Sequence, residues 1–197
     1  FNRAGGQAET LVIKNLTPSM VEESVEAIVK GIEKSQIIML PGGFSGGDEP
    51  DGSGKFIAAM FRNPRITEAV RDLLKNRDGL MLGICNGFQI LCEAGLLPGV
   101  LLENNNQQFI CKNVFLRADN NASRINATVP IGHALKIPIA HGEGRYYADD
   151  ATLKQLIANN QVIFSYCDDH GNATDTANPN GSMHNIAGVC NAGRNVF

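Results

Sequence analysis

Short apolar runs alternate with helix-like spacing along the first hundred positions. The run 80–82 lies between glycines and predicts a buried strand, and the apolar spacing after it predicts a helix that stops at Gly95. Residues 1–6 match the end of a helix followed by a glycine stop. Further strands are predicted at 10–16 and 36–40. Further helices are predicted from the capping box Ser19-x-x-Glu22 onward, at 56–61 and at 66–74.

The pattern changes between residues 107 and 139. Short β-rich segments at 109–116, 125–129 and 135–139 are separated by Asn, Asp, Gly and Pro, which predicts an inserted sheet section. A helix at 152–158 and strands at 161–166 and 185–190 follow. The alternation ahead of the insertion predicts a single α/β domain over 1–197. We expect a three-layer, flavodoxin-like fold, with a mostly parallel sheet and helices on both faces.

Composition and charge narrow the classes of protein. The chain has 197 residues, enough for one domain with a substantial core. A formal net charge of −3 argues against a nucleic-acid or anionic-membrane partner, and no apolar segment approaches the roughly 20 residues of a membrane-spanning helix. Five cysteines without a Cys-x-x-Cys pair suit a reducing compartment, so we expect a cytoplasmic protein.

Cys85 is the candidate nucleophile. The strand at 80–82 passes through Gly83 into a turn and then a helix, so Cys85 lies at a nucleophile elbow. A sulfur at a helix N-terminus is favoured as the thiolate, because the unpaired N–H groups and the helix dipole stabilise negative charge. The alternative is a buried structural cysteine. Four other cysteines have mostly apolar or strand surroundings and are interpreted as core residues: Cys92, Cys111, Cys167 and Cys190.

Amide hydrolysis also requires N–H donors for the tetrahedral oxyanion. The N–H of Asn86, just past the nucleophile, is one candidate, and the N–H of Gly43 or Phe44 is the other, because consecutive glycines let backbone approach a ligand. Pro41-Gly42-Gly43 could also be an ordinary tight turn. Gln89 lies one helical turn after Cys85 and could reach a ligand held at the sulfur; the alternative is a solvent-facing residue.

Several motifs together resemble the class I glutamine amidotransferases, and more narrowly the glutaminase domains of phosphoribosylformylglycinamidine synthases. They occur in the family's order and span most of the chain. The motifs are Leu40-Pro41-Gly42-Gly43-Phe44-Ser45, Gly83-Ile84-Cys85-Asn86-Gly87-Phe88-Gln89, Gly95-Leu96-Leu97-Pro98-Gly99, Ala140-His141-Gly142-Glu143-Gly144-Arg145 and Asn178-Pro179-Asn180-Gly181-Ser182.

The resemblance implies glutamine hydrolysis through a Cys85 thioester. The ammonia would serve the ATP-dependent conversion of formylglycinamide ribonucleotide to formylglycinamidine ribonucleotide in de novo purine biosynthesis. In this family the base is a histidine after the final strand, oriented by a glutamate two residues later. Residues 195–197 resemble the strand that leads into that motif, so the base and its glutamate are expected beyond Phe197.

His141 and Glu143 match a different family segment, one that helps to form the glutamine pocket. A competing hypothesis makes them the base and its orienting group. It requires a His141 ring nitrogen within hydrogen-bond reach of the Cys85 sulfur and Glu143 at the other nitrogen. The family's first strand is also expected ahead of Phe1. We therefore expect a domain truncated at both ends, with little glutamine turnover by itself.

The implied partners are glutamine and a synthetase, either a domain of the same chain or a separate subunit. ATP and magnesium are expected in that synthetase, since nothing here matches a Gly-x-x-x-x-Gly-Lys-Ser/Thr loop; this domain itself is expected to need no cofactor or metal. Two alternatives stay open. One is a related Cys-elbow hydrolase with another substrate, which Gln89 and the 178–182 loop disfavour. The other is a non-catalytic domain of the same fold.

Overall fold

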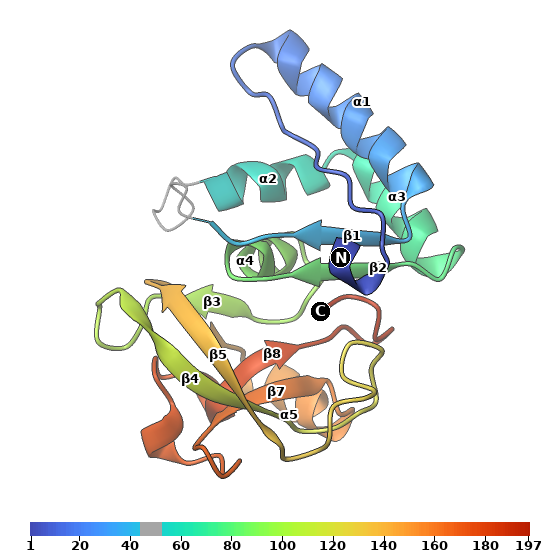
Figure 1. Ribbon diagram of the computed structural model, residues 1–197. Coiled ribbons are helices and arrows are strands. Elements are labelled where there is room, and N and C mark those ends of the chain that lie inside the picture. The colour runs from blue at the N-terminus through green and yellow to red at the C-terminus, as the bar shows by residue number, and fades with distance from the viewer. Residues whose placement is uncertain (44–52) are drawn as a thin grey trace.

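The computed structural model describes residues 1–43 and 53–197 (Figure 1). Its helices are α1 (Pro18–Lys34), α2 (Ser53–Phe61), α3 (Pro64–Lys75), α4 (Asn86–Glu93) and α5 (Asp150–Ala158), with 3-10 turns η1 (Asn2–Ala4), η3 (Asp175–Ala177) and η4 (Met183–Asn185). Its strands are β1 (Ile37–Leu40), β2 (Leu80–Gly83), β3 (Val100–Leu102), β4 (Ile110–Ala118), β5 (Ala134–His141), β6 (Arg145–Tyr147), β7 (Val162–Cys167) and β8 (Ile186–Val189). Among these residues, no helix combines the length and apolar character needed to cross a membrane.

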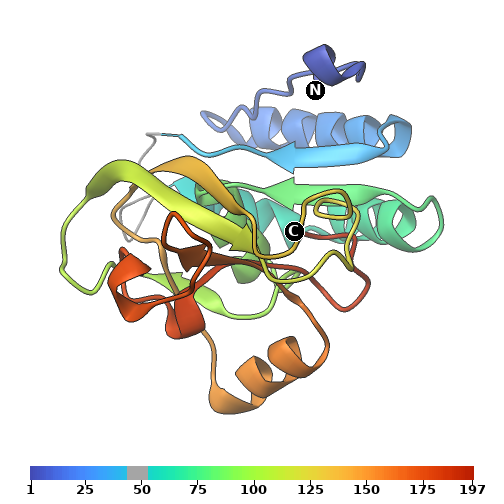
Figure 2. The same cartoon turned by 60° about the horizontal axis from the view of Figure 1, so that its bottom comes forward.

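The upper half of the molecule in Figure 1 is a parallel pair of strands, with α1, α2 and α3 above it and α4 behind it. Strands β1 and β2 pair in parallel, from Ile37 opposite Leu80 to Leu40 opposite Gly83. The last residues of the chain extend this sheet, because Val196 forms a parallel bridge with Met81. Figure 2 shows α1 and the other helices of this half behind the two strands. Parallel pairing places the carboxyl ends of β1 and β2 at one edge.

The two faces of β1–β2 have different neighbours. Ile38 and Leu40 pack into the main core, with the apolar faces of α1, α3 and α4. Leu80 and Leu82 pack instead against a smaller cluster of Ile163, Cys190 and Phe197. The mixed α/β class is therefore confirmed. Helices on both faces of the sheet are not what the described residues show, since on the second face β2 meets the lower half of the molecule and Ile37 and Met39 of β1 are exposed.

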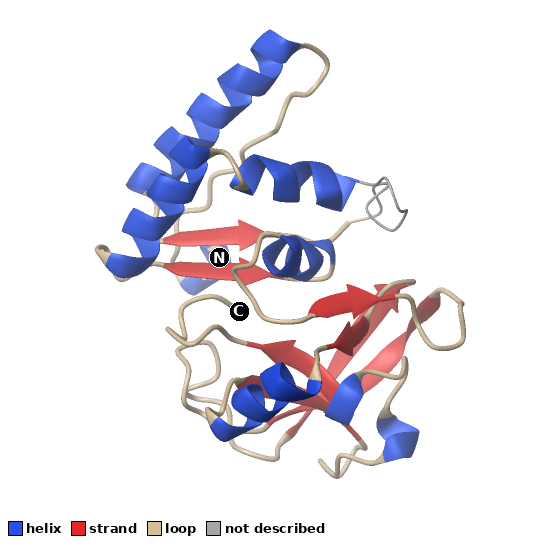
Figure 3. Ribbon diagram, turned by 180° about the vertical axis from the view of Figure 1, so that it is seen from behind, coloured by secondary structure: helices blue, strands red, loops and turns tan. Residues whose placement is uncertain are grey.

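The lower half is antiparallel. Strands β5-β4-β7-β8 form a four-stranded sheet, and β3 pairs with β6 beside it (Figure 3). The β-rich insertion is confirmed by β4 and β5, whose register runs from Ile110 opposite His141 to Arg117 opposite Ala134. The expectation of a mostly parallel sheet holds only for the upper half. Strands β3 and β6 have three residues each and were not predicted.

Residues 10–16 do not form the predicted strand. They form an extended connection that is attached to α1 by Ser24. The Ser24 hydroxyl donates to the Lys14 carbonyl (3.1 Å) and accepts from the Lys14 N–H (2.8 Å). Among the described residues no strand pairs with this segment, and Val12 and Leu16 are exposed. A β-propensity pattern yields a strand only when a neighbour completes the hydrogen-bond ladder.

Residues 125–129 form turns instead of the predicted strand. The cause is the fully buried Asn126. Its Oδ1 accepts from the N–H and hydroxyl of Ser123 (3.1 and 2.6 Å), and its Nδ2 donates to the Asn120 carbonyl (2.6 Å). Such local amide bonds compete with a ladder and fold the chain back.

The predicted capping box at Ser19 is also wrong. Thr17 is the N-cap of α1, its hydroxyl accepting from the Met20 N–H at 3.2 Å, and Pro18 occupies the first helical position.

Candidate active site

The strand-turn-helix around Cys85 has the geometry of a nucleophile elbow. Cys85 is the N-cap of α4, with φ 58° and ψ −114°, a conformation that a non-glycine residue rarely adopts. Its carbonyl accepts from the N–H groups of Phe88 (2.9 Å) and Gln89 (3.2 Å). Gly87 lets the turn close, since a Cβ there would overlap the Leu40 carbonyl. The strained backbone directs the Cys85 side chain out of the core, and Cys85 is exposed.

The Gly42-Gly43 turn lies directly against this elbow. It follows β1 just as the elbow follows β2, so the parallel register brings the two together. A Cβ at Gly42 would lie only 2.7 Å from the Cys85 Cβ, which makes glycine obligatory at this distance. The N–H groups of Gly43 and Asn86, the predicted oxyanion donors, hydrogen-bond to no acceptor within residues 1–43 and 53–197. Phe44, the alternative donor, lies outside the described residues.

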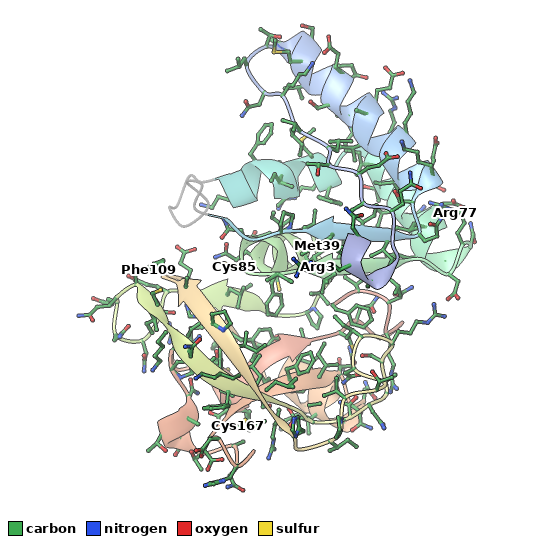
Figure 4. The ribbon with its side chains drawn as sticks, in the orientation of Figure 1. Arg3, Met39, Arg77, Cys85, Phe109 and Cys167 are labelled. Atoms are coloured by element: carbon green, nitrogen blue, oxygen red, sulfur yellow. The ribbon has the colours of Figure 1, made fainter. Side chains whose placement is uncertain are left out.

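A cavity of about 350 Å³ opens beside the Cys85 sulfur, between the upper and lower halves of the molecule (Figure 4). Its walls come from the elbow, the glycine turn, β5 and the loop after β5. Among the predicted site residues, it is lined by Gly43, Cys85, His141 and Glu143. The segment 140–145 at the end of β5 therefore lies at the same cavity as the Gly42-Gly43 turn and the Cys85 elbow.

Gln89 reaches across to Glu143. Its Nε2 lies 3.0 Å from the Glu143 carboxylate and 3.4 Å from the Glu143 carbonyl oxygen. The Gln89 Oε1 is buried and accepts no hydrogen bond from any part of the chain that the structure describes. Gln89 is thus not a solvent-facing helix residue. It is attached to the cavity wall, and it carries one buried acceptor that a ligand with N–H groups would satisfy.

The His141 ring is held by Asn104. Its Nδ1 lies 3.1 Å from the Asn104 Oδ1, and a Cβ at Gly144 would overlap its imidazole ring. The competing hypothesis required Glu143 at one ring nitrogen, with the other at the sulfur. Asn104 occupies Nδ1, and the Glu143 carboxylate accepts from Gln89. This pairing supports the interpretation of His141 and Glu143 as parts of the pocket wall.

Asn104 was missed by the sequence reasoning and organises the whole loop after β5. It is 1% exposed. Besides His141, its Oδ1 accepts from the Gly144 N–H (3.1 Å), and its Nδ2 donates to the carbonyls of Gln108 (2.8 Å) and His141 (2.9 Å). Asn104 is the first of three consecutive asparagines outside any periodic segment, and nothing in that run distinguishes the buried one. Its four bonds define the position from which Glu143 meets Gln89.

The 178–182 loop supports the same wall from behind. Asn180 is fully buried; its Nδ2 donates to the Gly144 carbonyl at 2.8 Å, and its Oδ1 accepts from the Ser182 hydroxyl at 2.8 Å. The Ser182 hydroxyl in turn accepts from the Tyr146 N–H at 3.0 Å. The Tyr146 ring stacks on Phe88 of α4, with 6.0 Å between centroids. The loop therefore couples the wall to α4, the helix that begins after the candidate nucleophile Cys85.

Three of the other cysteines are buried, as predicted for core residues. Desolvation by burial raises the pKa of the Cys92 thiol to about 12, and it also raises the pKa of Cys167 and of Cys190. Cys111 is exposed on β4, so the interpretation as a core residue is wrong for it. Residues 111–113 of β4 are all exposed, so neither face of the strand is covered there, which a strand pattern alone does not reveal. Within residues 1–43 and 53–197, no group of three His, Cys, Asp or Glu could hold a metal ion.

Comparison with known proteins gives consistent matches. Residues 1–196 match the model of the CobB/CobQ-like glutamine amidotransferase domain family. Phosphoribosylformylglycinamidine synthase subunit PurQ of Moorella thermoacetica is 52% identical over 160 residues, which are 81% of this chain and 65% of that protein. The PurQ subunit of Aquifex aeolicus is 43% identical, over 90% of this chain and 77% of that protein. The chain thus spans about two thirds to three quarters of the length of these relatives.

A solved structure agrees with the sequence comparisons. The structure of PurLQS from Thermotoga maritima contains a chain that matches with a TM-score of 0.64 and 37% sequence identity. The match covers 84% of this chain and 67% of that one.

Proposed function

Because this chain belongs to the CobB/CobQ-like glutamine amidotransferase domain family, we propose that it is the glutaminase part of a phosphoribosylformylglycinamidine synthase. It hydrolyses glutamine and delivers ammonia for the formation of formylglycinamidine ribonucleotide. The observation that carries the proposal is the elbow: a strained cysteine at a helix N-terminus faces a glycine turn and a cavity whose wall holds Glu143. The names of the Moorella and Aquifex relatives support the choice of synthase.

The proposed reaction begins at the Cys85 sulfur. The thiolate attacks the side-chain amide carbon of glutamine, and the carbonyl π electrons move onto oxygen. The N–H groups of Asn86 and Gly43 stabilise this oxyanion, which is supported by their lack of other acceptors among the described residues. The intermediate collapses to a thioester, the C–N bond breaks, and the nitrogen leaves as ammonia after gaining a proton. Water then attacks the thioester, which releases glutamate and restores the thiol.

The proton is assigned to a histidine that would follow Phe197 in a longer chain, with a glutamate to orient it. The course of the last three residues supports this placement. Residues 195–197 run parallel to β2: the Phe197 N–H donates to the Met81 carbonyl at 2.9 Å, and the Gly83 N–H donates to the Phe197 carbonyl at 2.8 Å. Chain that continued in this direction would arrive beside the residues that follow Gly83, among them Cys85.

Glutamine itself is assigned to the cavity. Its α-ammonium group is complementary to the Glu143 carboxylate and to the buried Oε1 of Gln89, which otherwise accepts no hydrogen bond among the described residues. The buried phenol groups of Tyr146 and Tyr166 contribute shape and no proton transfer, because burial raises the pKa of both and that of Tyr166 to about 12.

We assign ATP and magnesium to a synthetase partner and a cytoplasmic location to the complex. A separate synthetase subunit is supported by the relatives' description as subunits.

The test is to trap the covalent intermediate. The full-length enzyme is quenched in acid during glutamine turnover, digested and examined by mass spectrometry. The account predicts a glutamyl adduct on the peptide that contains Cys85. Release of glutamate with an adduct on another cysteine would overturn the proposal. A Cys85 adduct formed from a different amide, with none from glutamine, would favour the related hydrolase instead.

A further inference from the structure

The side chain of Asn86 connects the two loops that meet at the nucleophile. It is 5% exposed, although it occupies the first position of α4 beside an open cavity. Its Nδ2 donates to the Gly43 carbonyl at 3.2 Å, and its Oδ1 lies 3.9 Å from the Cys85 sulfur. The proposed reaction uses only the backbone N–H of this residue. Its amide side chain therefore has no role in the mechanism described so far.

The Gly43 carbonyl needs a constraint. Gly42 and Gly43 have no Cβ, so their peptide groups rotate more freely than those of other residues. A Gly43 carbonyl oxygen that turned toward the sulfur would stand where the oxyanion forms and would repel it. Among the described residues, the side-chain amide of Asn86 is the group that binds this carbonyl.

We propose that Asn86 is a positioning residue, whose side-chain amide holds the Gly43 carbonyl and so keeps the glycine turn in the orientation that binds the oxyanion. This inference rests on the proposed glutaminase function. A smaller residue in place of Asn86 would fill its site less completely but would leave the Cys85 backbone in place. An aspartate would keep the shape while losing the donor, and it would set a negative charge against the carbonyl oxygen.

The effect should fall on the transition state and not on substrate binding. Loss of one oxyanion donor costs about 10²- to 10³-fold in kcat. Loss of a hydrogen bond that only orients the turn should cost less, so we expect kcat for glutamine to fall about 10- to 100-fold in Asn86→Ala and Asn86→Asp. KM should stay within about threefold, because Gln89 and Glu143 are unchanged.

The experiment uses the full-length enzyme with its synthetase and two probes of Cys85. An aldehyde analogue of glutamine, glutamate γ-semialdehyde, adds to the thiolate and leaves an oxyanion; iodoacetamide alkylates the sulfur without one. We expect both variants to bind the aldehyde about 10- to 100-fold more weakly, while the rate of alkylation changes less than threefold in Asn86→Ala, which sets no charge beside the sulfur. Asn76→Ala, at an exposed asparagine after α3, is the control and should change neither quantity.

Two outcomes would overturn the inference. Unchanged kcat and aldehyde affinity in both variants would mean that the Gly43 carbonyl needs no restraint. Equal losses of aldehyde binding and alkylation would mean that Asn86 acts on the sulfur and not on the turn. Failure of the wild-type enzyme to hydrolyse glutamine would instead reject the proposed function, so the two failures are distinguishable.

Discussion

The side-chain amide of Gln89 on α4 donates to the carboxylate of Glu143, 54 positions later in the chain, with 3.0 Å between Nε2 and Oε2. This bond joins the helix that follows the candidate nucleophile Cys85 to the wall of the cavity. The Gln89 Oε1 stays buried without a donor among the described residues, so the two residues are proposed as a unit that recognises the ammonium group of glutamine.

Replacing Gln89 should therefore weaken glutamine use selectively. In the complete enzyme, Gln89→Ala should lower kcat/KM for glutamine by about 10- to 100-fold, the range expected for hydrogen bonds to charged groups. The reaction supplied directly with ammonia should be spared, since it bypasses the glutaminase pocket. Gln155→Ala, at an exposed glutamine of α5, is the matched control. Equal losses with glutamine and with ammonia would show that Gln89 is structural.

The thiols should differ sharply in reactivity. Cys85 should react first with mild iodoacetamide, and with a glutamine-like diazoketone it should be the labelled residue. Cys92, Cys167 and Cys190 should stay unmodified in the folded protein, because they are buried and burial raises the pKa of each. Cys111 is exposed, so it tests whether accessibility alone is sufficient. Faster labelling of Cys111 than of Cys85 by the diazoketone would contradict the assignment of the nucleophile.

The contact between the glycine turn and the elbow predicts a severe effect of one methyl group. Gly42→Ala would place a Cβ 2.7 Å from the Cys85 Cβ, so the turn or the nucleophile must move. A displacement of about 1 Å can cost 10²-fold, and we expect a loss of glutamine turnover of that order. Gly31→Ala in α1 is the control, because its new methyl group would meet only Leu11, at 3.5 Å. Glutamate release by coupled assay measures both; full activity in Gly42→Ala would refute the close approach.

Asn104 should contribute to stability as well as to the pocket. Asn104→Ala removes a side chain that makes four hydrogen bonds in a buried loop. Leaving those groups unsatisfied should lower the free energy of unfolding by about 2–3 kcal/mol. Asn106→Ala, at an exposed neighbour with one bond, should lower it by less than about 1 kcal/mol. Urea titration of the full-length proteins compares them. Similar midpoints for the two variants would remove Asn104 from its organising role.

The elbow could be predicted from sequence because its determinants are local. A glycine-bounded apolar run, a turn and a 3.6-residue period lie within residues 79–95, and no distant partner is needed to specify them. Residues 10–16 show the opposite case. Their apolar pattern is that of a strand, yet a strand depends on a neighbour, and no strand of the described residues pairs with them.

The pocket wall could be predicted only in part. His141 and Glu143 were assigned to it by resemblance, but their bonds to Asn104 and Gln89 depend on tertiary structure. Single amides such as Asn104 and Asn126 act through hydrogen bonds to backbone groups, some far along the chain and some local. Neither the distant nor the local bonds produce a periodic signal in the sequence. The local bonds of Asn126 hold residues 125–129 in turns where a strand was predicted.

Two paired assays of one variant test whether Cys85 attacks glutamine. In the complete synthase, Cys85→Ala should abolish glutamine-dependent product formation, while the rate with added ammonium should stay within about twofold of wild type. That separation is expected because the thiolate is the nucleophile for the amide and takes no part when ammonia is supplied. Glutamine-dependent turnover that survives in Cys85→Ala would contradict the account.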